Sequence, residues 1–318
     1  MHMDWLVFTP IVQERPWGGR AFEARLGRAL PPGGRFGESW EIVDRAEAQS
    51  HASRGPLAGL ALREIMRRHA DALMGPGWDP ARPFPLLVKW LDLRAPVSIQ
   101  VHPPADYAAR AGAEPKTECW YMHAADPGAF AWCGLKPGVD AASLRAACAD
   151  GGIGRLLERR EVRAGDSVFV PAGRMHAPGS GLLVLEVQQN SDTTYRIHDW
   201  GRVGVDGRPR PLHVEQALAC AILEGVSEPV PGRERGESLC ADAPEFRLRR
   251  FAAAPGDAAH ELRPEPGRPA VLTLLSGAVE ASSAVLPRPG ESALIPASWS
   301  GTIRLPPGSA VLLADRFC

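Results

Sequence analysis

The sequence predicts a mainly β protein, built as a barrel or sandwich with a few short helices. Short apolar runs alternate with turn-forming residues along most of the chain, and glycine and proline number 33 and 31 among its 318 residues. Turns at this frequency separate short strands, which is typical of all-β barrels and sandwiches. The length suits one large or two modest domains and is ample for a buried core.

Three segments interrupt the β pattern and are predicted to be helices. Leu57–Leu73 carries apolar residues at helical spacing and ends before a Gly-Pro-Gly sequence that stops a helix. Ala141–Leu157 and His213–Leu223 are the other two candidates. The first of these segments is therefore expected to be a short helical insertion, near residues 57–75, in an otherwise β domain.

The C-terminal part of the chain is predicted to be a second β-domain without a metal. From Phe246 onward the strand pattern resumes, after a segment at Ser227–Glu237 that resembles a linker. This part holds a single histidine, His260, which can hardly build an imidazole-based metal site on its own. We expect a metal-bearing domain at residues 1–230 and a metal-free, barrel-like domain at 240–318.

Composition limits the kinds of partner. Hydrophobic residues make up 45% and charged residues 23% of the chain, which are ordinary values for a globular protein. The net charge of −1 creates no overall field that would favour nucleic acid or a membrane surface. An anionic substrate would therefore have to be held by a local cluster of positive groups.

The sequence also favours a cytoplasmic location. Met1–Trp5 lacks the charged region and the apolar stretch of a signal peptide, and no apolar run approaches the roughly 20 residues of a spanning helix. The six cysteines are scattered without a Cys-x-x-Cys pair. Such cysteines are expected to be reduced thiols, rather than a disulfide frame or a thiolate zinc site.

Lysine is scarce, and the few lysines lie close together in the sequence. All but three of the 36 basic residues are arginines, and the exceptions are Lys89, Lys116 and Lys136. Where arginine replaces lysine so widely, a lysine that is kept is a candidate for a role that needs a compact ammonium. Chance clustering is the alternative interpretation.

A predicted strand at Pro96–Pro103 has one apolar and one polar face. Because side chains alternate along a strand, Ser98, Gln100 and His102 point to the side opposite the three aliphatic residues between them. Buried polar groups need partners, and a metal or a ligand is one way to supply them. A solvated outer face of an edge strand is the alternative.

A second predicted strand, Lys116–Tyr121, places Lys116, Glu118 and Trp120 on one face. A lysine beside a glutamate is most often a plain ion pair. This segment therefore indicates a site only in combination with the others.

A third segment, Gly165–His176, matches the second cupin motif. Its spacing Gly-x5-Pro-x-Gly-x2-His predicts a strand that enters a tight turn and presents His176 at the start of the next strand. Ser180 stands where cupins usually have asparagine.

A fourth segment, Leu182–Arg196, changes from apolar to polar along its length. If it continues as one strand without a bulge, Asp192, Thr194 and Arg196 share a face.

Together these strands predict a metal site with the ligands Gln100, His102, Glu118 and His176. Imidazole nitrogen and carboxylate oxygen suit zinc and several other divalent ions. The absence of thiolates from the set favours a catalytic over a structural site.

The same segments resemble the type I mannose-6-phosphate isomerases of the cupin superfamily, in their shorter bacterial form. The resemblance spans roughly residues 10 to 225, with the motifs in the same order as in the family. It lies in Pro16–Gly19, Gly37–Glu41, Phe84–Asp92, Val97–Pro103, Lys116–Tyr121 and Ser191–Arg196.

This resemblance implies a jelly-roll-like cupin barrel followed by a second, degenerate barrel, and one zinc ion per chain. It implies that Gln100, His102, Glu118 and His176 bind the zinc. The catalytic residues that it implies are Arg196, Lys116 and Asp192, and the substrate-binding residues are Ser98, Lys89 and Trp17.

The implied reaction interconverts mannose 6-phosphate and fructose 6-phosphate by proton transfer through a cis-enediol. Two other functions stay open at this point. Two histidines and a carboxylate are also the ligands of an iron-dependent cupin oxygenase. A non-catalytic sugar-binding cupin would carry the same fold without turnover.

Overall fold

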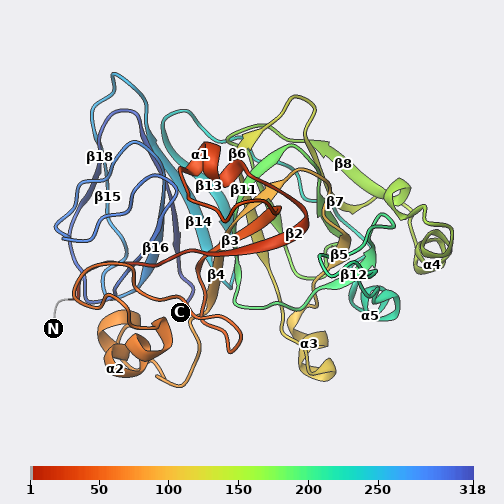
Figure 1. Ribbon diagram of the computed structural model, residues 1–318, viewed down its shortest axis with the longest axis horizontal. Coiled ribbons are helices and arrows are strands. Elements are labelled where there is room, and N and C mark those ends of the chain that lie inside the picture. Colours follow the sequence, from red (N-terminus) through yellow and green to blue (C-terminus); the bar gives the residue numbers. More distant parts are fainter. Residues whose placement is uncertain (1–2) are drawn as a thin grey trace. The chain divides into compact units, whose positions relative to one another are not determined.

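The computed structural model describes residues 3–318 (Figure 1). Met1 and His2, which begin the segment Met1–Trp5 that lacks signal-peptide features, lie outside that range. The helices are α1 (Ala21–Leu26), α2 (Leu62–Met74), α3 (Ala105–Ala111), α4 (Ala141–Asp150), the 3₁₀ helix η1 (Ile153–Leu156) and α5 (Val214–Cys220). The strands are β1 (Leu6–Val7), β2 (Ile11–Gly19), β3 (Phe36–Ile42), β4 (Leu86–Leu93), β5 (Ile99–Val101), β6 (Glu118–Ala125), β7 (Phe130–Leu135), β8 (Leu157–Glu161), β9 (Ser167–Val170), β10 (His176–Pro178), β11 (Leu182–Gln189), β12 (Tyr195–His198), β13 (Gly236–Asp242), β14 (Arg247–Ala253), β15 (His260–Leu262), β16 (Ala270–Ser276), β17 (Ser292–Ile295), β18 (Ile303–Leu305) and β19 (Ser309–Asp315). The predicted mainly β class is confirmed.

The chain forms two compact units that alternate along the sequence. The C-terminal unit combines the segment up to Ile11 with Trp40–Lys89 and Gly232–Cys318, and the central unit combines Val12–Ser39 with Trp90–Pro231. The predicted domains, 1–230 and 240–318, are instead continuous in sequence. The predicted division assigns the segments up to Ile11 and Trp40–Lys89 to the first domain, whereas the structure groups them with the C-terminal strands. The predicted domain boundaries stay a prediction.

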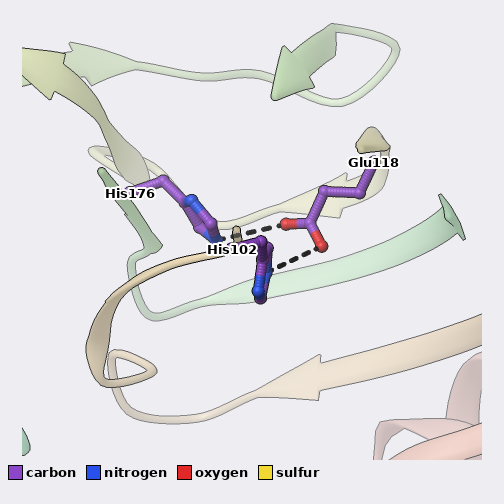
Figure 2. Close-up of side chains that lie close together, drawn as sticks. All are labelled: His102, Glu118 and His176. Carbon is purple, nitrogen blue, oxygen red and sulfur yellow. Dashed lines mark ion pairs between the residues drawn. The ribbon is translucent and has the colours of Figure 1, made fainter. Parts of the chain in front are cut away.

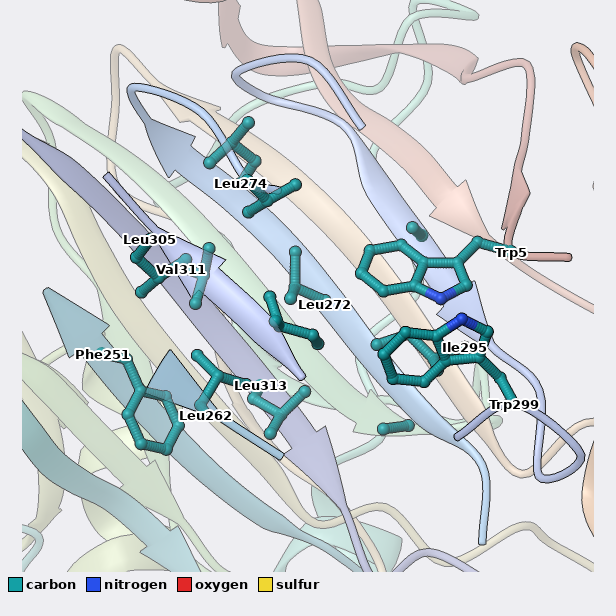
Figure 3. Packing of buried hydrophobic residues seen from close by; sticks show 14 of the residues in the cluster. Trp5, Phe251, Leu262, Leu272, Leu274, Ile295, Trp299, Leu305, Val311 and Leu313 are labelled. Carbon is teal, nitrogen blue, oxygen red and sulfur yellow. The ribbon is translucent and has the colours of Figure 1, made fainter. Parts of the chain in front are cut away.

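The C-terminal unit is built on a six-stranded sheet with the order β1-β17-β16-β19-β14-β13. Its neighbouring strands run antiparallel, as in the β14–β19 and β16–β19 pairs. Apolar side chains from this sheet, from the two-stranded sheet β15-β18 and from the segments between strands form a continuous core (Figure 3). Within it the rings of Trp5 and Trp299 meet edge to face, with their centroids 5.3 Å apart.

Helix α2 confirms the predicted helical insertion, with a later start than predicted. The residues after Leu57 form a turn before the helix begins at Leu62. Leu62, Ile65 and Leu73 are buried, as the helical spacing of apolar residues predicts. The helix ends at Gly75, whose φ of 101° few other residues adopt.

The central unit contains two antiparallel sheets, with the orders β2-β3-β4-β11-β6-β9 and β12-β5-β10-β7-β8. The boundary between the two units falls within β3 and β4. Helices α4 and α5 confirm the other two predicted helices but are shorter than expected. Asp140 caps α4 through Ser143 N, and Gly151 ends it in the left-handed conformation, so that Ile153–Leu156 forms a separate 3₁₀ turn.

The segment Leu182–Arg196 is not one continuous strand, so the condition on which Asp192, Thr194 and Arg196 were expected to share a face is not met. Strand β11 ends at Gln189 and β12 begins at Tyr195. The intervening segment turns, because Ser191 N donates to Gln189 O at 2.7 Å and Gln188 Nε2 donates to Ser191 O at 2.7 Å. Asp192 is exposed in this turn.

No helix in residues 3–318 combines the length and the apolar character that crossing a membrane requires.

The core of the C-terminal unit yields a stability prediction. Leu272 is fully buried on the inner strand β16, so Leu272→Ala should lower the free energy of unfolding by about 2–5 kcal/mol. Leu239→Ala is the matched control, because Leu239 is 51% exposed and its truncation should change the free energy by less than about 0.5 kcal/mol. Urea unfolding of both variants measures the difference. Equal midpoints would contradict the assignment of this core.

Candidate metal centre

Three buried side chains from separate strands of the central unit meet at one point (Figure 2). His102 follows β5, Glu118 begins β6 and His176 begins β10. Their possible ligand atoms all lie within 4.8 Å of one another, and no other such group of His, Cys, Asp and Glu occurs in the part of the chain that the structure describes. Nε2 of His102 is 3.2 Å from Glu118 Oε2, and Nε2 of His176 is 3.3 Å from Glu118 Oε1.

Backbone carbonyls determine which ring nitrogen of each histidine carries the proton. Nδ1 of His102 lies 3.0 Å from the carbonyl oxygen of Thr193, and Nδ1 of His176 lies 2.8 Å from that of Arg174. A carbonyl can only accept, so both Nδ1 atoms carry the hydrogen and donate it. The unprotonated Nε2 atoms of both rings consequently face Glu118, with their lone pairs available for a ligand.

This arrangement leaves an excess of acceptors in a buried place. Oε1 of Glu118 faces the unprotonated Nε2 of His176 and accepts no hydrogen bond. The ammonium of Lys116 compensates one side, since Nζ lies 2.7 Å from Glu118 Oε2 and 3.1 Å from His102 Nε2. The lone pairs of the two imidazoles and the free carboxylate oxygen converge on one place. A cation bound there would satisfy all of them.

The protonation states match those of metal ligands. Burial, assisted by the nearby Lys116 ammonium, lowers the pKa of His102 to about 3, and burial also lowers the pKa of His176. For Glu118, burial alone would raise the pKa, but the Lys116 ammonium outweighs it and holds the pKa well below its usual value. At neutral pH the site thus holds two neutral imidazoles and one carboxylate, the forms that bind metals.

Gln100 is the fourth predicted ligand, and it lies against this group. Its Nε2 is 3.2 Å from Nε2 of His176, and its Oε1 accepts a hydrogen bond of 3.2 Å from Ser98 Oγ. The oxygen and nitrogen of an amide exchange places by a half-turn of the side chain. Gln100 can therefore present either an oxygen or an N–H to the centre.

The two histidines contact different oxygens of Glu118, with His102 Nε2 3.2 Å from Oε2 and His176 Nε2 3.3 Å from Oε1. The group is therefore compact enough for its ligand atoms to share one cation. Nitrogen and oxygen ligands without thiolates suit zinc and several other divalent ions equally well.

Strand register places Arg196 beside this group. On β5, Gln100 pairs with His176 of β10 on one side and with Arg196 of β12 on the other. Directly paired residues of antiparallel strands point to the same face, so the three form a row across the sheet. Partial burial lowers the pKa of Arg196 from its usual value, yet arginine stays charged at any working pH.

The loop between β12 and α5 forms hydrogen bonds with both the backbone and the guanidinium of Arg196. Arg196 Nη1 donates to Pro211 O at 3.3 Å, and its backbone N donates to His213 Nδ1 at 3.3 Å. The loop is closed by Asp199, whose buried carboxylate binds both Arg202 and Arg210. Sequence analysis missed this loop, because its signal is one aspartate among scattered arginines.

The remaining predicted site residues differ in their surroundings. Ser98 and Lys116 are buried at the centre, and Lys89 is buried on β4. Trp17 is 3% exposed and belongs to an apolar core cluster with Leu91 and others. Asp192 is exposed, and the catalytic and substrate-binding roles of all these residues stay predictions.

Another buried carboxylate, which sequence analysis missed, contacts Trp120. Glu186 on β11 pairs with Trp120 on β6 and accepts a hydrogen bond of 3.0 Å from its Nε1. The Trp120 ring in turn packs against the ring of His176, with centroids 5.4 Å apart. A glutamate in the otherwise apolar run Leu182–Val187 is the signal that could have found it.

Comparisons with known proteins show which proteins this chain resembles. The family model "Phosphomannose isomerase type I, catalytic domain" matches residues 6–143. The chain is 38% identical over 225 residues to "Probable mannose-6-phosphate isomerase GmuF" of Bacillus subtilis (strain 168), which covers 70% of each chain. It is 36% identical over 230 residues to "Mannose-6-phosphate isomerase ManA" of the same strain, covering 72% of this chain and 71% of that one. The crystal structure of the mannose 6-phosphate isomerase from Bacillus subtilis superimposes with a TM-score of 0.85 at 27% identity, covering 98% of this chain and 99% of that chain.

The centre predicts which histidines hold a metal. His102→Ala and His176→Ala should each lose most of the bound metal after dialysis, because each removes one of the converging lone pairs. His260→Ala in the C-terminal unit is the control and should keep the wild-type content. Elemental analysis of the purified proteins gives the metal content. Full metal occupancy in both site variants would refute the assignment.

Proposed function

Because the chain belongs to the type I phosphomannose isomerase family, we propose that it interconverts mannose 6-phosphate and fructose 6-phosphate as a zinc-dependent aldose–ketose isomerase. The observation that carries the proposal is the meeting of His102, Glu118 and His176 beside a buried lysine. We further propose one zinc ion per chain, a cytoplasmic location and a small sugar phosphate as the partner.

The proposed ligands are Gln100, His102, Glu118 and His176. A zinc ion bound there would polarise the substrate carbonyl and hold the neighbouring oxygens in place. The protein's part is to keep both Nε2 atoms unprotonated and the carboxylate charged, which the carbonyls of Thr193 and Arg174 and the ammonium of Lys116 achieve.

The isomerisation moves a proton between C2 and C1 through a cis-enediol, and this step needs a positioned acid/base. Lys116 and Asp192 are the proposed candidates. Lys116 is buried and contacts two of the proposed ligands directly, whereas Asp192 is exposed in the turn after β11. Their surroundings therefore favour Lys116 as the group nearer to the reacting carbons.

Arg196 is proposed to stabilise the charge that develops on the enediolate oxygens. It lies in the same row across the sheet as Gln100 and His176, and its backbone and guanidinium are held by the loop that follows β12. A cation fixed in this way need not reorganise during the reaction, which is why it lowers the barrier. Ser98, Lys89 and Trp17 are proposed to contribute to the substrate pocket.

The two other functions fit less well. An iron-dependent oxygenase would use the same histidines and glutamate but has no need of a buried lysine or of Arg196. A non-catalytic sugar-binding protein would not need a lysine shared between two metal ligands. Membership of an isomerase family argues against both.

A chelator test separates these functions. Purified protein should interconvert the two sugar phosphates in a coupled assay, lose this activity with a chelator and regain it with zinc. Substrate incubated in deuterated water should gain deuterium at C1 or C2, because the proton transferred through the enediol exchanges with solvent. A binding protein would incorporate none, and an oxygenase would instead consume oxygen.

Arg196→Ala tests the proposed role of the arginine. Removing one preorganised charge-stabilising group typically costs about 10² to 10³ in turnover, so kcat should fall by about that factor. Metal content and melting temperature should remain close to those of the wild type. Arg163→Ala, at a side chain that is 80% exposed, is the control and should retain full activity. Early unfolding of Arg196→Ala with normal turnover by its folded fraction would show a structural role instead.

A further inference from the structure

The segment 221–231, which we call the strap, runs along the central unit after helix α5 and makes backbone hydrogen bonds to three of its parts. Ile222 N donates to Gly173 O at 2.8 Å, Ser227 N donates to Cys133 O at 3.1 Å, and Val230 N donates to Ser167 O at 2.8 Å. Near its far end, Glu228 forms a two-pronged ion pair with Arg160, with both contacts at 2.8 Å.

One side chain joins the strap to the turn that carries His176. Arg174 Nη1 donates to the carbonyl oxygens of Glu224, at 2.7 Å, and of Gly225. A Cβ atom on residue 225 would lie 2.9 Å from this Nη1, and Gly225 has a φ of +79°. Glycine therefore leaves the guanidinium its place against the strap.

The same residue holds the ring of His176 through its backbone. Its carbonyl oxygen accepts the hydrogen bond from His176 Nδ1 at 2.8 Å, and its N–H donates to Pro171 O at 3.1 Å. The preceding residue, Gly173, donates its N–H to the backbone carbonyl of His102 at 2.7 Å. This turn thus contacts both histidines of the centre.

We propose that Arg174 is a positioning residue of the metal centre: its guanidinium, clamped by the strap, holds its own carbonyl where that carbonyl sets the tautomer and direction of the His176 ring. A partner that orients a metal-binding imidazole raises the affinity for the metal, because the ring pays no cost of reorientation on binding. The inference rests on the proposed metal site and not on the identity of the sugar.

The test compares two arginines that hold the same strap. Arg174→Met removes the donors beside His176 and keeps the apolar stem, whereas Arg160→Met removes the tie to Glu228 and leaves the turn intact. For each protein we would measure the zinc dissociation constant by competition with a chromophoric chelator, the rate of zinc release, and the melting temperature of the metal-free form. NMR of ¹⁵N-histidine-labelled protein follows the Nδ1–H proton of His176.

Arg174→Met should bind zinc about 10-fold more weakly and should release it faster. This is the lower end of the loss in affinity that usually follows when a residue that orients a metal ligand is replaced. Its His176 Nδ1–H signal should broaden through exchange with water, while its metal-free melting temperature should fall no further than that of Arg160→Met. Arg160→Met should keep the wild-type zinc affinity.

Wild-type zinc affinity in Arg174→Met would overturn the inference, and so would an equal loss of affinity in both variants, which would indicate a purely structural strap. If Arg174→Met does not fold, Arg174→Gln, which keeps one donor, should show a smaller loss of the same sign, and unchanged affinity there would also overturn it. Failure of the wild type to bind zinc, with the His176 proton still protected, would refute the metal site instead.

Discussion

The buried carboxylate of Glu118 faces two imidazole nitrogens that carry no proton, and this concentration of lone pairs dominates the central unit. Taking an ionised carboxylate out of water is costly unless positive charge is brought to it. Lys116 supplies one such charge at 2.7 Å from Oε2, while Oε1 is left facing His176. The same electrostatic demand that suits the group to a cation also explains why a lysine is buried beside it.

Much of the surrounding structure holds these few atoms in place. The carbonyls of Thr193 and Arg174 come from two different turns, and each orients one imidazole. Sheet register adds Gln100 and Arg196 to the same face. The loop after β12 holds Arg196, and the strap holds Arg174. A site with converging acceptors tolerates little movement, because a small rotation of either ring would point its lone pair away from the shared position.

The C-terminal unit uses related strand architecture for a different purpose. Its sheet encloses leucines, valines and tryptophans such as Trp5 and Trp299, which pack against one another without a cluster of titratable groups. Burial of apolar surface is sufficient to stabilise such a core. The central unit also has apolar cores, and the contrast between the two units lies in the buried His102, Glu118 and His176 group that only the central unit adds among the described residues.

The sequence by itself determined the β class, three of the helices and the histidine–glutamate–histidine group, because alternation along a strand, helical spacing of apolar residues and the Gly-x5-Pro-x-Gly turn before His176 are local properties of the chain. It could not show that the run after Gln189 turns before Asp192, since that turn depends on one hydrogen bond from the Gln188 side chain and one from the Ser191 backbone. The grouping of the segments before Ile11 and from Trp40 to Lys89 with the C-terminal strands was decided only by tertiary structure. So were the backbone carbonyls that set each imidazole, because every residue has a carbonyl and only the fold brings one particular carbonyl to one particular ring.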